Sequence, residues 1–416
     1  MTKSNSTEAR CLRLGIIGLG RAAAVMLPSL AAHPEITLIA AADPDAGARQ
    51  RFQERFGGTL HAGAHALLAQ PEIDAVYIAT PHQFHVEHAV AAAAAGKHFI
   101  VEKPLALMAA DCRQIVEAAR RAGVVSLVGH TAGFDPGVRR MRELIAGGSL
   151  GALRMINTFS YTDFLYRPRR PEELDSSLGG GIMFNQVPHQ IDMIRVLAQT
   201  PVRAVRAHTG IWDPARPTEG ALMAFIEFTN GVCASLVYSG YDHFDSDELC
   251  GWIGPGGRRK TPAHGSARRA LRRAGSGDER AARMARGVAG NHSKPSGGRE
   301  SAGTSPNADG AVHQPHFGML LASCDSADLR IGADALIVYA DEGMHEVALP
   351  SGRATPNRDA VIDDFLAAIR YGSPPLQDAA WGAATMDIVF ALIRSAEERR
   401  EITFDPPIAQ PYSIQK

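Results

Sequence analysis

Short apolar runs alternate with helix-like stretches over the first third of the chain. The runs fall at residues 12–17, 37–42, 73–79, 97–101 and 124–128, and several are followed by alanine-rich segments. Strands that helices cover on both faces have this nearly continuous apolar character. The pattern predicts an α/β unit of the Rossmann type with a parallel sheet over residues 11–131.

The remainder of the chain, residues 132–416, has a different rhythm. A helix is expected at 136–146, and strands with alternating or apolar character are expected at 153–161, 202–211, 221–228 and 232–240, the last two joined by an Asn230-Gly231 hairpin turn. Further strands at 316–323 and 335–339 and amphipathic helices at 358–371 and 379–399 complete the prediction. We therefore expect a C-terminal α+β domain with an open sheet over residues 132–416. Such a sheet suits a homodimer or homotetramer.

Residues 254–314 interrupt this pattern. They are rich in Gly, Arg, Ser and Ala, and residues 267–273 and 280–286 could form basic helices. A mobile basic insertion is expected, with a lid or an oligomer clasp as alternatives. A nucleic-acid arm is disfavoured, because acids and glycines dilute the arginines and stacking aromatics are lacking. Residues 1–10 are polar and are expected to be disordered.

Composition narrows the function classes. The chain has 416 residues, 45% of them hydrophobic, and a net charge of −1, so nothing global indicates a nucleic-acid or membrane partner. The sequence shows no apolar signal core and no run of membrane-spanning length, which favours a cytoplasmic protein. Five scattered cysteines favour reduced thiols over a disulfide framework.

The first strand runs into a glycine turn, Gly18-Leu19-Gly20-Arg21-Ala22-Ala23. Gly18 would permit the tight turn, and Gly20 would let the backbone approach a pyrophosphate. Ala23 stands in place of a third glycine, where a small residue lets helix and strand pack closely. The segment from Gly18 to Ala22, including Arg21, is the predicted dinucleotide-binding turn.

Asp43 ends the second strand about twenty residues after the turn, where an acid can accept hydrogen bonds from the adenosine ribose. An acid there repels a 2′-phosphate, so NAD is favoured over NADP. Arg49 and Arg51 lie nearby and weaken this preference. The alternative is a glycine turn that serves chain geometry only.

The third strand ends in Thr80-Pro81 and is followed by His85. Ligands collect at the carboxyl ends of parallel strands, so these three residues are expected to border the cofactor. Histidines at 82, 85, 88 and 98 raise the question of a metal. No carboxylate or cysteine joins them at a metal-ligand spacing, so no metal is predicted.

The next strand leads into Glu102-Lys103-Pro104, and Gly179-Gly180-Gly181 precedes Asn185 and His189 further along. With the glycine turn, these motifs resemble the Gfo/Idh/MocA oxidoreductases over nearly the whole chain. The resemblance implies a Rossmann domain, then a substrate-binding and oligomerisation domain with a mostly antiparallel open sheet, and NAD-dependent redox chemistry. Asn185 departs from the aspartate of many members and can orient a hydroxyl but cannot take a proton.

Oxidation of a secondary alcohol needs a base within hydrogen-bonding reach of the hydroxyl. His189 is poised to accept a proton near neutral pH, and the Lys103 ammonium can orient the oxygen and stabilise an alkoxide. We predict His189 as the base with Lys103 polarising, although the reverse remains open. Glu102 is expected to position Lys103 or the ribose. The alternatives are a surface lysine and a capping histidine.

A loop with three arginines, Arg167, Arg169 and Arg170, also carries Tyr166. Guanidinium groups can fork onto carboxylates, so the loop could bind a carboxylated ring. It resembles the branch of the family that oxidises phthalate 4,5-cis-dihydrodiol to 4,5-dihydroxyphthalate in aromatic degradation. The alternative is a solvated loop whose arginines pair with the acids at 172, 173 and 175.

Two other functions remain open from the sequence. A sugar or inositol dehydrogenase of the same family would need polar groups around the ring instead of an arginine clamp. A dinucleotide-binding sensor or repressor without turnover is the alternative from another class. Retention of both Lys103 and His189 argues against it.

Overall fold

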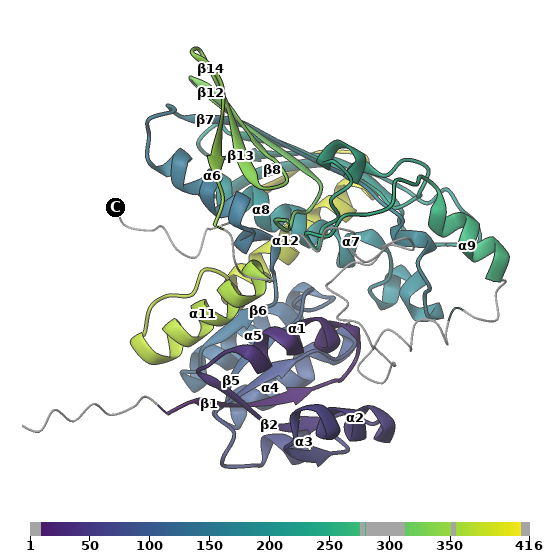
Figure 1. The fold of residues 1–416 in the computed structure, drawn as a ribbon, viewed down its shortest axis with the longest axis vertical. Coiled ribbons are helices and arrows are strands. Elements are labelled where there is room, and N and C mark those ends of the chain that lie inside the picture. Colours follow the sequence, from purple (N-terminus) through teal and green to yellow (C-terminus); the bar gives the residue numbers. More distant parts are fainter. Residues whose placement is uncertain (1–9, 275–278, 280–312, 351–354, 409–416) are drawn as a thin grey trace, which may run out of the picture.

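The computed structural model describes residues 10–274, 279, 313–350 and 355–408. They form two β-sheets with helices between and around them (Figure 1). The residues predicted to be a disordered N-terminus lie outside the described part, except Arg10, which forms an ion pair with Asp74.

The first sheet is parallel throughout, in the order β3-β2-β1-β4-β5-β6. Its strands are β1 (Leu12–Ile17), β2 (Ile36–Ala42), β3 (Thr59–His61), β4 (Ala75–Ile78), β5 (His98–Val101) and β6 (Ser126–Val128). The helices are α1 (Arg21–Ala32), α2 (Ala46–Phe56), α3 (Ala64–Leu68), α4 (His85–Ala94) and α5 (Ala109–Ala122). Strand order reverses on either side of β1, which opens a crevice at the carboxyl ends of β1 and β4.

The second sheet has nine strands in the order β14-β13-β12-β11-β7-β10-β9-β8-β15. Only β7 and β10 pair in parallel, so the predicted α/β fold with a mostly antiparallel second sheet is confirmed. The strands are β7 (Leu153–Tyr161), β8 (Val202–Gly210), β9 (Ala221–Phe228), β10 (Cys233–Ser239), β11 (Met319–Cys324), β12 (Ala327–Ile331), β13 (Ala335–Ala340), β14 (Gly343–Ala348) and β15 (Ile402–Ile408).

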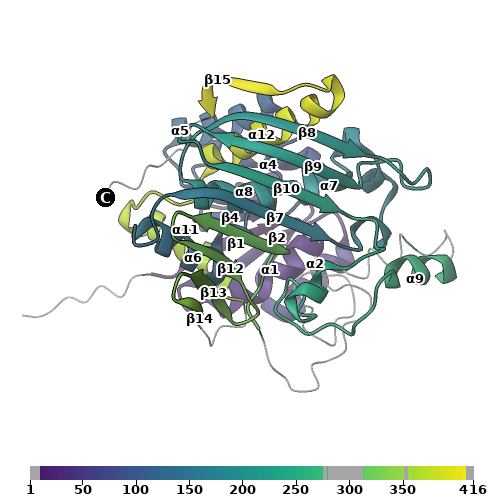
Figure 2. The same ribbon diagram turned by 90° about the horizontal axis from the view of Figure 1, so that it is seen from above.

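Helices cover one face of this second sheet. They are α6 (Pro136–Ala146), α7 (Gly181–Asn185), α8 (Val187–Ala198) and α12 (Ala379–Glu398). Seen from above, the strands lie over these helices, and the outer face of the sheet is turned to the viewer (Figure 2). In β9, Leu222, Ala224 and Ile226 point to the helices and are buried, whereas Met223 and Phe225 are exposed.

α12 is long and apolar enough to cross a membrane by length and composition, the one such helix in the part of the chain that the structure describes. Most of it is buried inside the protein, however. It packs on α5 and β8, and the side chain of Arg195 in α8 donates to the Trp381 carbonyl of α12 at 2.8 Å. These contacts make α12 a core helix that joins the two sheets.

α11 (Pro356–Tyr371) lies near the end of the chain but packs on the first sheet's side of the molecule. Its Val361, Ile362 and Phe365 are buried in one apolar cluster with Leu14 and Leu27 of β1 and α1. The strands of the first sheet thus precede residue 131 and those of the second sheet follow it. α11 follows it too, but packs with the elements of the first sheet.

Strands β3, β12, β14 and β15 were not predicted. β14 lies at one edge of the second sheet and is mostly exposed, so it carries no apolar alternation. β15 lies at the other edge and contains Pro406 and Pro407, residues that edge strands tolerate and that obscure a strand pattern.

The described start of the expected insertion is folded against the protein, which corrects the prediction for residues 254–274. The Lys260 ammonium is buried and forms ion pairs with Asp245 and, at 2.7 Å, with Asp247. A basic helix, α9 (Ser266–Ala274), forms where one was expected, and Ala267 buries its side chain. The buried Lys260 was missed because its two acidic partners precede it in a separate loop. The rest of the stretch, apart from residues 279, 313 and 314, lies outside the described residues.

Candidate active site

A cavity of about 630 Å³ lies at the carboxyl ends of β1, β2 and β4. Seven of the residues predicted to bind the dinucleotide line it. They are Gly18, Gly20, Arg21, Ala22, Asp43, Thr80 and Pro81. The parallel sheet thus brings together segments as far apart in sequence as Gly18 and Pro81.

Gly18 and Gly20 have different steric roles in the turn. Gly18 has φ +89°, and a Cβ there would lie 2.8 Å from the carbonyl of Ala79 in the neighbouring strand end, so only glycine fits. A Cβ on Gly20 would meet no atom within 4 Å. Gly20 also precedes the first residue of α1, so the open space lies at a helix N-terminus, which suits a pyrophosphate.

Asp43 holds the turn from the end of β2. Its carboxylate accepts hydrogen bonds from the backbone N–H of Leu19 at 2.7 Å and of Asp45 at 2.8 Å. Carboxylate oxygens have lone pairs beyond these two bonds, so Asp43 can still accept from ribose hydroxyls. Arg49 turns toward the backbone instead, donating to the carbonyls of Asp43 and Pro44.

His85 is the exception among the predicted cofactor residues. Its ring is fully buried at the start of α4 and lies behind the walls of both cavities described here. The ring nitrogens lie 3.0 Å from the Thr80 carbonyl and 2.8 Å from the Pro104 carbonyl. His85 therefore braces two loops of the site from behind. The neighbouring His82, which was not predicted, lines both cavities.

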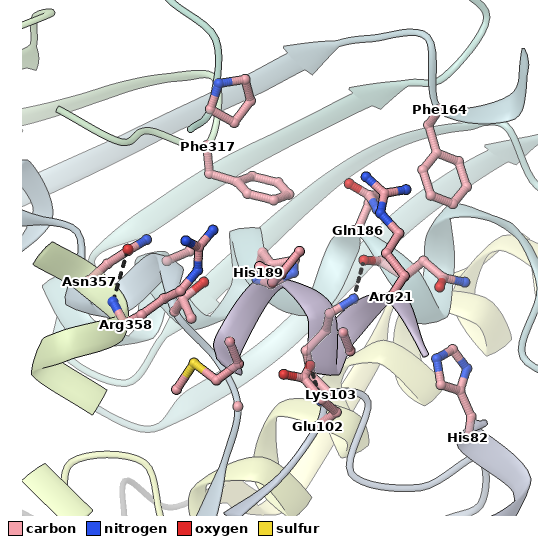
Figure 3. A pocket seen from close by; sticks show the side chains of 18 of the residues that line it. Arg21, His82, Glu102, Lys103, Phe164, Gln186, His189, Phe317, Asn357 and Arg358 are labelled. Carbon is pink, nitrogen blue, oxygen red and sulfur yellow. Dashed lines mark hydrogen bonds between the residues drawn. The ribbon is translucent and has the colours of Figure 1, made fainter. Parts of the chain in front are cut away.

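A second cavity, of about 280 Å³, lies between the first sheet's carboxyl edge and the helices of the second sheet. It shares six lining residues with the first cavity: Arg21, Ala22, Thr80, His82, Glu173 and Asn185. The two cavities are therefore contiguous. Glu102, Lys103 and His189 line only the second one (Figure 3).

Lys103 enters the second cavity from the end of β5. Its Nζ donates to the backbone carbonyl of Asn185 at 3.0 Å, which ties the first signature motif to the second. Glu102 lies next to it, partly buried, and accepts a 2.5 Å hydrogen bond from the Tyr77 hydroxyl. Burial raises the pKa of Glu102, although Lys103 and Tyr77 oppose the shift. Glu102 is thus placed to hold the loop that carries Lys103.

Asn185 is fixed by the glycine triplet. Its Nδ2 donates to the carbonyls of Gly179 at 2.9 Å and Gly181 at 2.8 Å. Two carbonyl acceptors identify the atom that faces them as the amide nitrogen, which leaves Oδ1 as an acceptor. A carboxylate at this position would face two carbonyl oxygens and be repelled, so this turn favours an amide over an aspartate.

His189 lies in the first turn of α8, one helical turn beyond Asn185. Its ring centroid is 4.8 Å from that of Phe317 and 6.3 Å from that of His130. Burial, reinforced by Lys103 and Arg195, lowers the pKa of His130 to about 3, so His130 is neutral beside His189. The rings of Phe317 and His189 form an apolar and hydrogen-bonding wall of the cavity (Figure 3).

A buried polar network holds α8 in place behind His189. Asp192 accepts hydrogen bonds from the backbone N–H of Gly133 at 2.9 Å, from Gln377 Nε2 and from Trp381 Nε1, the last two at 2.8 Å. Burial raises the pKa of Asp192 to about 6, against the effect of these donors. The network fixes the helix that presents His189 relative to α12 and the first sheet.

The arginines of the loop have acidic and carbonyl partners within the protein. Arg167 is buried and forms a 2.5 Å ion pair with Asp163, and this charge lowers the pKa of Asp163 although burial opposes the shift. Arg169 is engaged by the Phe164 carbonyl and lies 3.7 Å from Glu173. Both arginines line the second cavity, but each already has protein partners.

Arg170 and Tyr166 lie outside the wall of the second cavity. Arg170 lines the first cavity and lies 3.3 Å from both Glu172 and Glu173. The Tyr166 hydroxyl donates to Asp213 at 2.5 Å, and its ring lies under the Arg268 guanidinium. The loop therefore supplies acids for its own arginines, and the binding of a carboxylated ring by these arginines stays a prediction. The alternative of arginines paired with neighbouring acids describes Arg169 and Arg170.

Several residues of the second cavity were missed from the sequence. Asp135, Asn357, Arg358, His316 and Phe317 come from segments that carry no motif, and α11 brings in two of them. Burial raises the pKa of Asp135 to about 7, partly offset by a 2.7 Å hydrogen bond from Asn357. A charged Arg358 at the start of an amphipathic helix is an ordinary surface pattern, so no sequence signal marked it.

Comparison with known proteins decides the family. Residues 12–130 match the model of the oxidoreductase family with an NAD-binding Rossmann fold, and residues 138–257 match the GFO/IDH/MocA C-terminal domain. The chain belongs to the Gfo/Idh/MocA oxidoreductases. The family resemblance and the oxidoreductase class that the sequence predicted are thereby confirmed.

Among Gfo/Idh/MocA proteins, a Comamonas testosteroni relative is 39% identical over 93% of this chain and 95% of its own length. It is named 1-carboxy-3-chloro-3,4-dihydroxycyclohexa-1,5-diene dehydrogenase. A Thermotoga maritima myo-inositol 2-dehydrogenase is 29% identical over 47% of this chain and 58% of its own. A solved structure from Bordetella bronchiseptica RB50, named only as a dehydrogenase, is 43% identical with a TM-score of 0.87, covering 95% of this chain and 100% of its own.

Proposed function

We propose that this oxidoreductase is an NAD-dependent dehydrogenase of carboxylated cyclohexadiene cis-diols, with phthalate 4,5-cis-dihydrodiol as the specific candidate. The observation that carries the proposal is the contiguity of the two cavities, with Lys103 and His189 in the wall of the second. This arrangement suits a nicotinamide that reaches from the glycine turn toward a ring alcohol. The 39% identical relative, whose name gives a carboxylated ring diol, supports the substrate class.

The residues fit an NAD better than an NADP. Asp43 and Asp45 both line the first cavity at the end of β2. Two carboxylates there favour ribose hydroxyls and repel a 2′-phosphate. The open space over Gly20 fits the pyrophosphate. When bound, the cofactor accepts a hydride from the carbinol carbon.

The side chains of the second cavity divide the remaining work. His189 takes the hydroxyl proton, and the Lys103 ammonium, oriented by the Asn185 carbonyl, stabilises the negative charge that develops on the oxygen. Asn185 offers Oδ1 to a second hydroxyl of the diol. The resulting hydroxy-ketone tautomerises to a catechol, and aromatisation draws the reaction forward.

The test is NADH formation by the purified protein. Phthalate 4,5-cis-dihydrodiol, 3,4-dihydroxycyclohexa-1,5-diene-1-carboxylate, myo-inositol and a set of aldoses are offered in parallel with NAD and with NADP. Turnover of either carboxylated diol, with the polyols inert, supports the proposal and identifies the number of carboxylates. Turnover of polyols alone would overturn the substrate class and leave the family chemistry intact.

Assembly and location belong to the same proposal. We propose a homodimer or homotetramer formed through the outer face of the second sheet, where Met223, Phe225, Met155 and Met344 are exposed. Apolar side chains on a sheet face without covering helices are typical of an interface. Light scattering after size-exclusion chromatography, with Phe225→Glu as the disrupting variant, tests it. A cytoplasmic location remains a prediction, and neither a nucleic acid nor a membrane is proposed as a partner.

A further inference from the structure

Arg358 is the arginine of the second cavity whose charge has no protein partner. Arg167 pairs with Asp163, and Arg169 is held by the Phe164 carbonyl and Glu173. Within the described part of the chain, the Arg358 guanidinium makes no hydrogen bond or ion pair, although the residue is partly buried and lines the cavity. A charged donor fork turned into a cavity without a partner suits an anionic ligand group.

The acids around Arg358 do not cancel its charge. Asp135 and Glu102 face the same region, and burial is the main cause that raises the pKa of each, to about 7 for Asp135. A substantial share of Asp135 is therefore protonated near neutral pH. Burial thus favours the uncharged form of both neighbouring acids, which leaves more of the Arg358 charge available to a ligand.

The backbone that carries Arg358 is fixed on two sides. Asn357 donates to Asp135 at 2.7 Å, and its Oδ1 accepts from the Arg358 backbone N–H at 2.9 Å. On the other side, the Thr355 hydroxyl lies 2.8 Å from the hydroxyl of Ser29 in α1. These contacts hold the first turn of α11 against the cavity wall, so the guanidinium is presented from a rigid element.

Figure 3 places Arg358 and Asn357 on one side of His189, with Phe164 and His82 on the other. Phe317 lies beside His189, with ring centroids 4.8 Å apart, and lines the same cavity. Arg358 lines the second cavity and not the first, so a cofactor phosphate at the glycine turn is not its partner. The anion that Arg358 meets therefore belongs to the ring substrate.

We propose that Arg358 binds a ring carboxylate of the substrate and thereby determines specificity for carboxylated diols over neutral ones. The proposal rests on the proposed function, because it assigns the carboxylate end of the same ring. It transfers the role predicted for the arginine loop to a residue of α11. The loop arginines become scaffold, since their charges are already engaged by Asp163 and Glu173.

Equilibrium binding tests this without turnover. Calorimetric titration of the NADH complex uses two product-like pairs: 3,4-dihydroxybenzoate against catechol, and 4,5-dihydroxyphthalate against catechol. In Arg358→Met, the Kd of the carboxylated ligand should rise roughly 10- to 100-fold, as expected for one lost charge-assisted fork, while that of catechol changes little. Arg358→Lys should be intermediate, because it keeps the charge and loses the fork.

Arg370→Met is the matched control, since Arg370 lies in the last turn of the same helix and pairs with Glu35. It should leave both affinities unchanged. Equal weakening of carboxylated and neutral ligands in Arg358→Met, or no weakening of either, would overturn the role of Arg358. If the wild type binds dihydroxybenzoate through Arg358 yet oxidises no cis-diol, the proposed function fails and the carboxylate site stands.

If the protein turns over a cis-diol, separate measurement of KM and kcat gives a second test. Arg358→Met should raise KM for a carboxylated cis-diol roughly 10- to 100-fold and leave kcat/KM for benzene cis-dihydrodiol near the wild-type value. A fall in kcat alone, at unchanged KM, contradicts a carboxylate-binding role. Melting temperatures of both variants check that the fold is retained.

Discussion

The two cavities are built in different ways, although they share a wall. The first is lined by strand ends and turns of one parallel sheet, where Gly18, Gly20 and Asp43 act through backbone shape and backbone hydrogen bonds. The second collects side chains from loops and helices that lie hundreds of residues apart, such as Lys103 and Arg358. The first cavity therefore suits a ligand common to a family, and the second a ligand that changes from member to member.

Within the second cavity, the residues proposed to act on the reacting oxygen and those that line the rest of the wall also differ in origin. Lys103 and His189 come from the two family motifs and face the reacting oxygen in our proposal. Arg358 and Asp135 come from segments without a motif. Substitutions should accordingly fall into three groups, which affect turnover, cofactor choice and the protonation of the cavity wall.

The largest effect is expected from Lys103→Met. It removes the ammonium that stabilises alkoxide charge, so kcat/KM should fall about 10³-fold, while NADH affinity persists because Lys103 lies outside the first cavity. Steady-state kinetics and NADH fluorescence titration measure the two quantities. Lys97→Met, which removes a lysine bonded to two carbonyls before the same strand, should lower the melting temperature and spare kcat. If Lys103→Met no longer bound NADH, Lys103 would contribute to cofactor binding and the separate roles of the two cavities would be wrong.

His189→Asn should come next, with kcat/KM reduced roughly 10²- to 10³-fold. As the proposed base, His189 must be neutral to accept a proton, so the acidic limb of the wild-type pH–rate profile should vanish in the variant. The neighbouring His130 lines neither described cavity, so His130→Asn should have a much smaller effect on kcat. If the acidic limb survives in His189→Asn, the base is another group, and Lys103 is the first alternative.

Asp43→Asn addresses the cofactor end. An amide cannot supply a charge-assisted acceptor to the ribose or repel a 2′-phosphate, so the NAD over NADP preference should fall by about tenfold. Asp45→Asn is the matched change in the same cavity wall, and asparagine still caps α2 there. Its effect on the preference should be smaller. An unchanged ratio of kcat/KM values in Asp43→Asn would show that selectivity lies elsewhere.

The smallest effect should appear in stability as a function of pH. The unfolded Asp135 carboxyl titrates near 3.8 and the folded one near 7, so the folded state binds the extra proton between these values. Stability conferred by that proton is present at low pH and is lost as pH rises through 7. Asp135→Asn should therefore gain a few degrees of melting temperature relative to wild type between pH 5 and pH 8. A constant difference at both pH values contradicts a buried, shifted Asp135.

The residues of the first cavity were easier to predict from the sequence than those of the second. Gly18 and Asp43 could be read from the sequence because their roles depend on a strand, a turn and a helix that are consecutive in the chain. For the arginine loop, the sequence did not show which acids the arginines meet: Asp163 and Glu173 lie beside Arg167 and Arg169 in the fold and form ion pairs with them. His85 was placed at the right strand end, yet its ring turns into the loops behind the cavity.

In the fold, β7 and β9 were predicted with their observed bounds because alternation of buried and exposed residues is a local property. β14 and β15 were missed because edge strands need no such alternation. The position of α11 could not be predicted at all. The sequence shows that α11 has an apolar face, but it does not show that this face packs against Leu14 and Leu27.

That placement of α11 has a consequence for synthesis on the ribosome. Residues 12–130 emerge first, but the apolar surface formed by Leu14, Leu27 and their neighbours is completed by Val361 and Phe365 near the end of the chain. The nascent Rossmann unit must therefore stay with that surface uncovered until the second sheet has been translated. The step most exposed to chaperones and to aggregation is thus the interval before α11 leaves the exit tunnel, and a stalled or truncated message would release a protein with an open core.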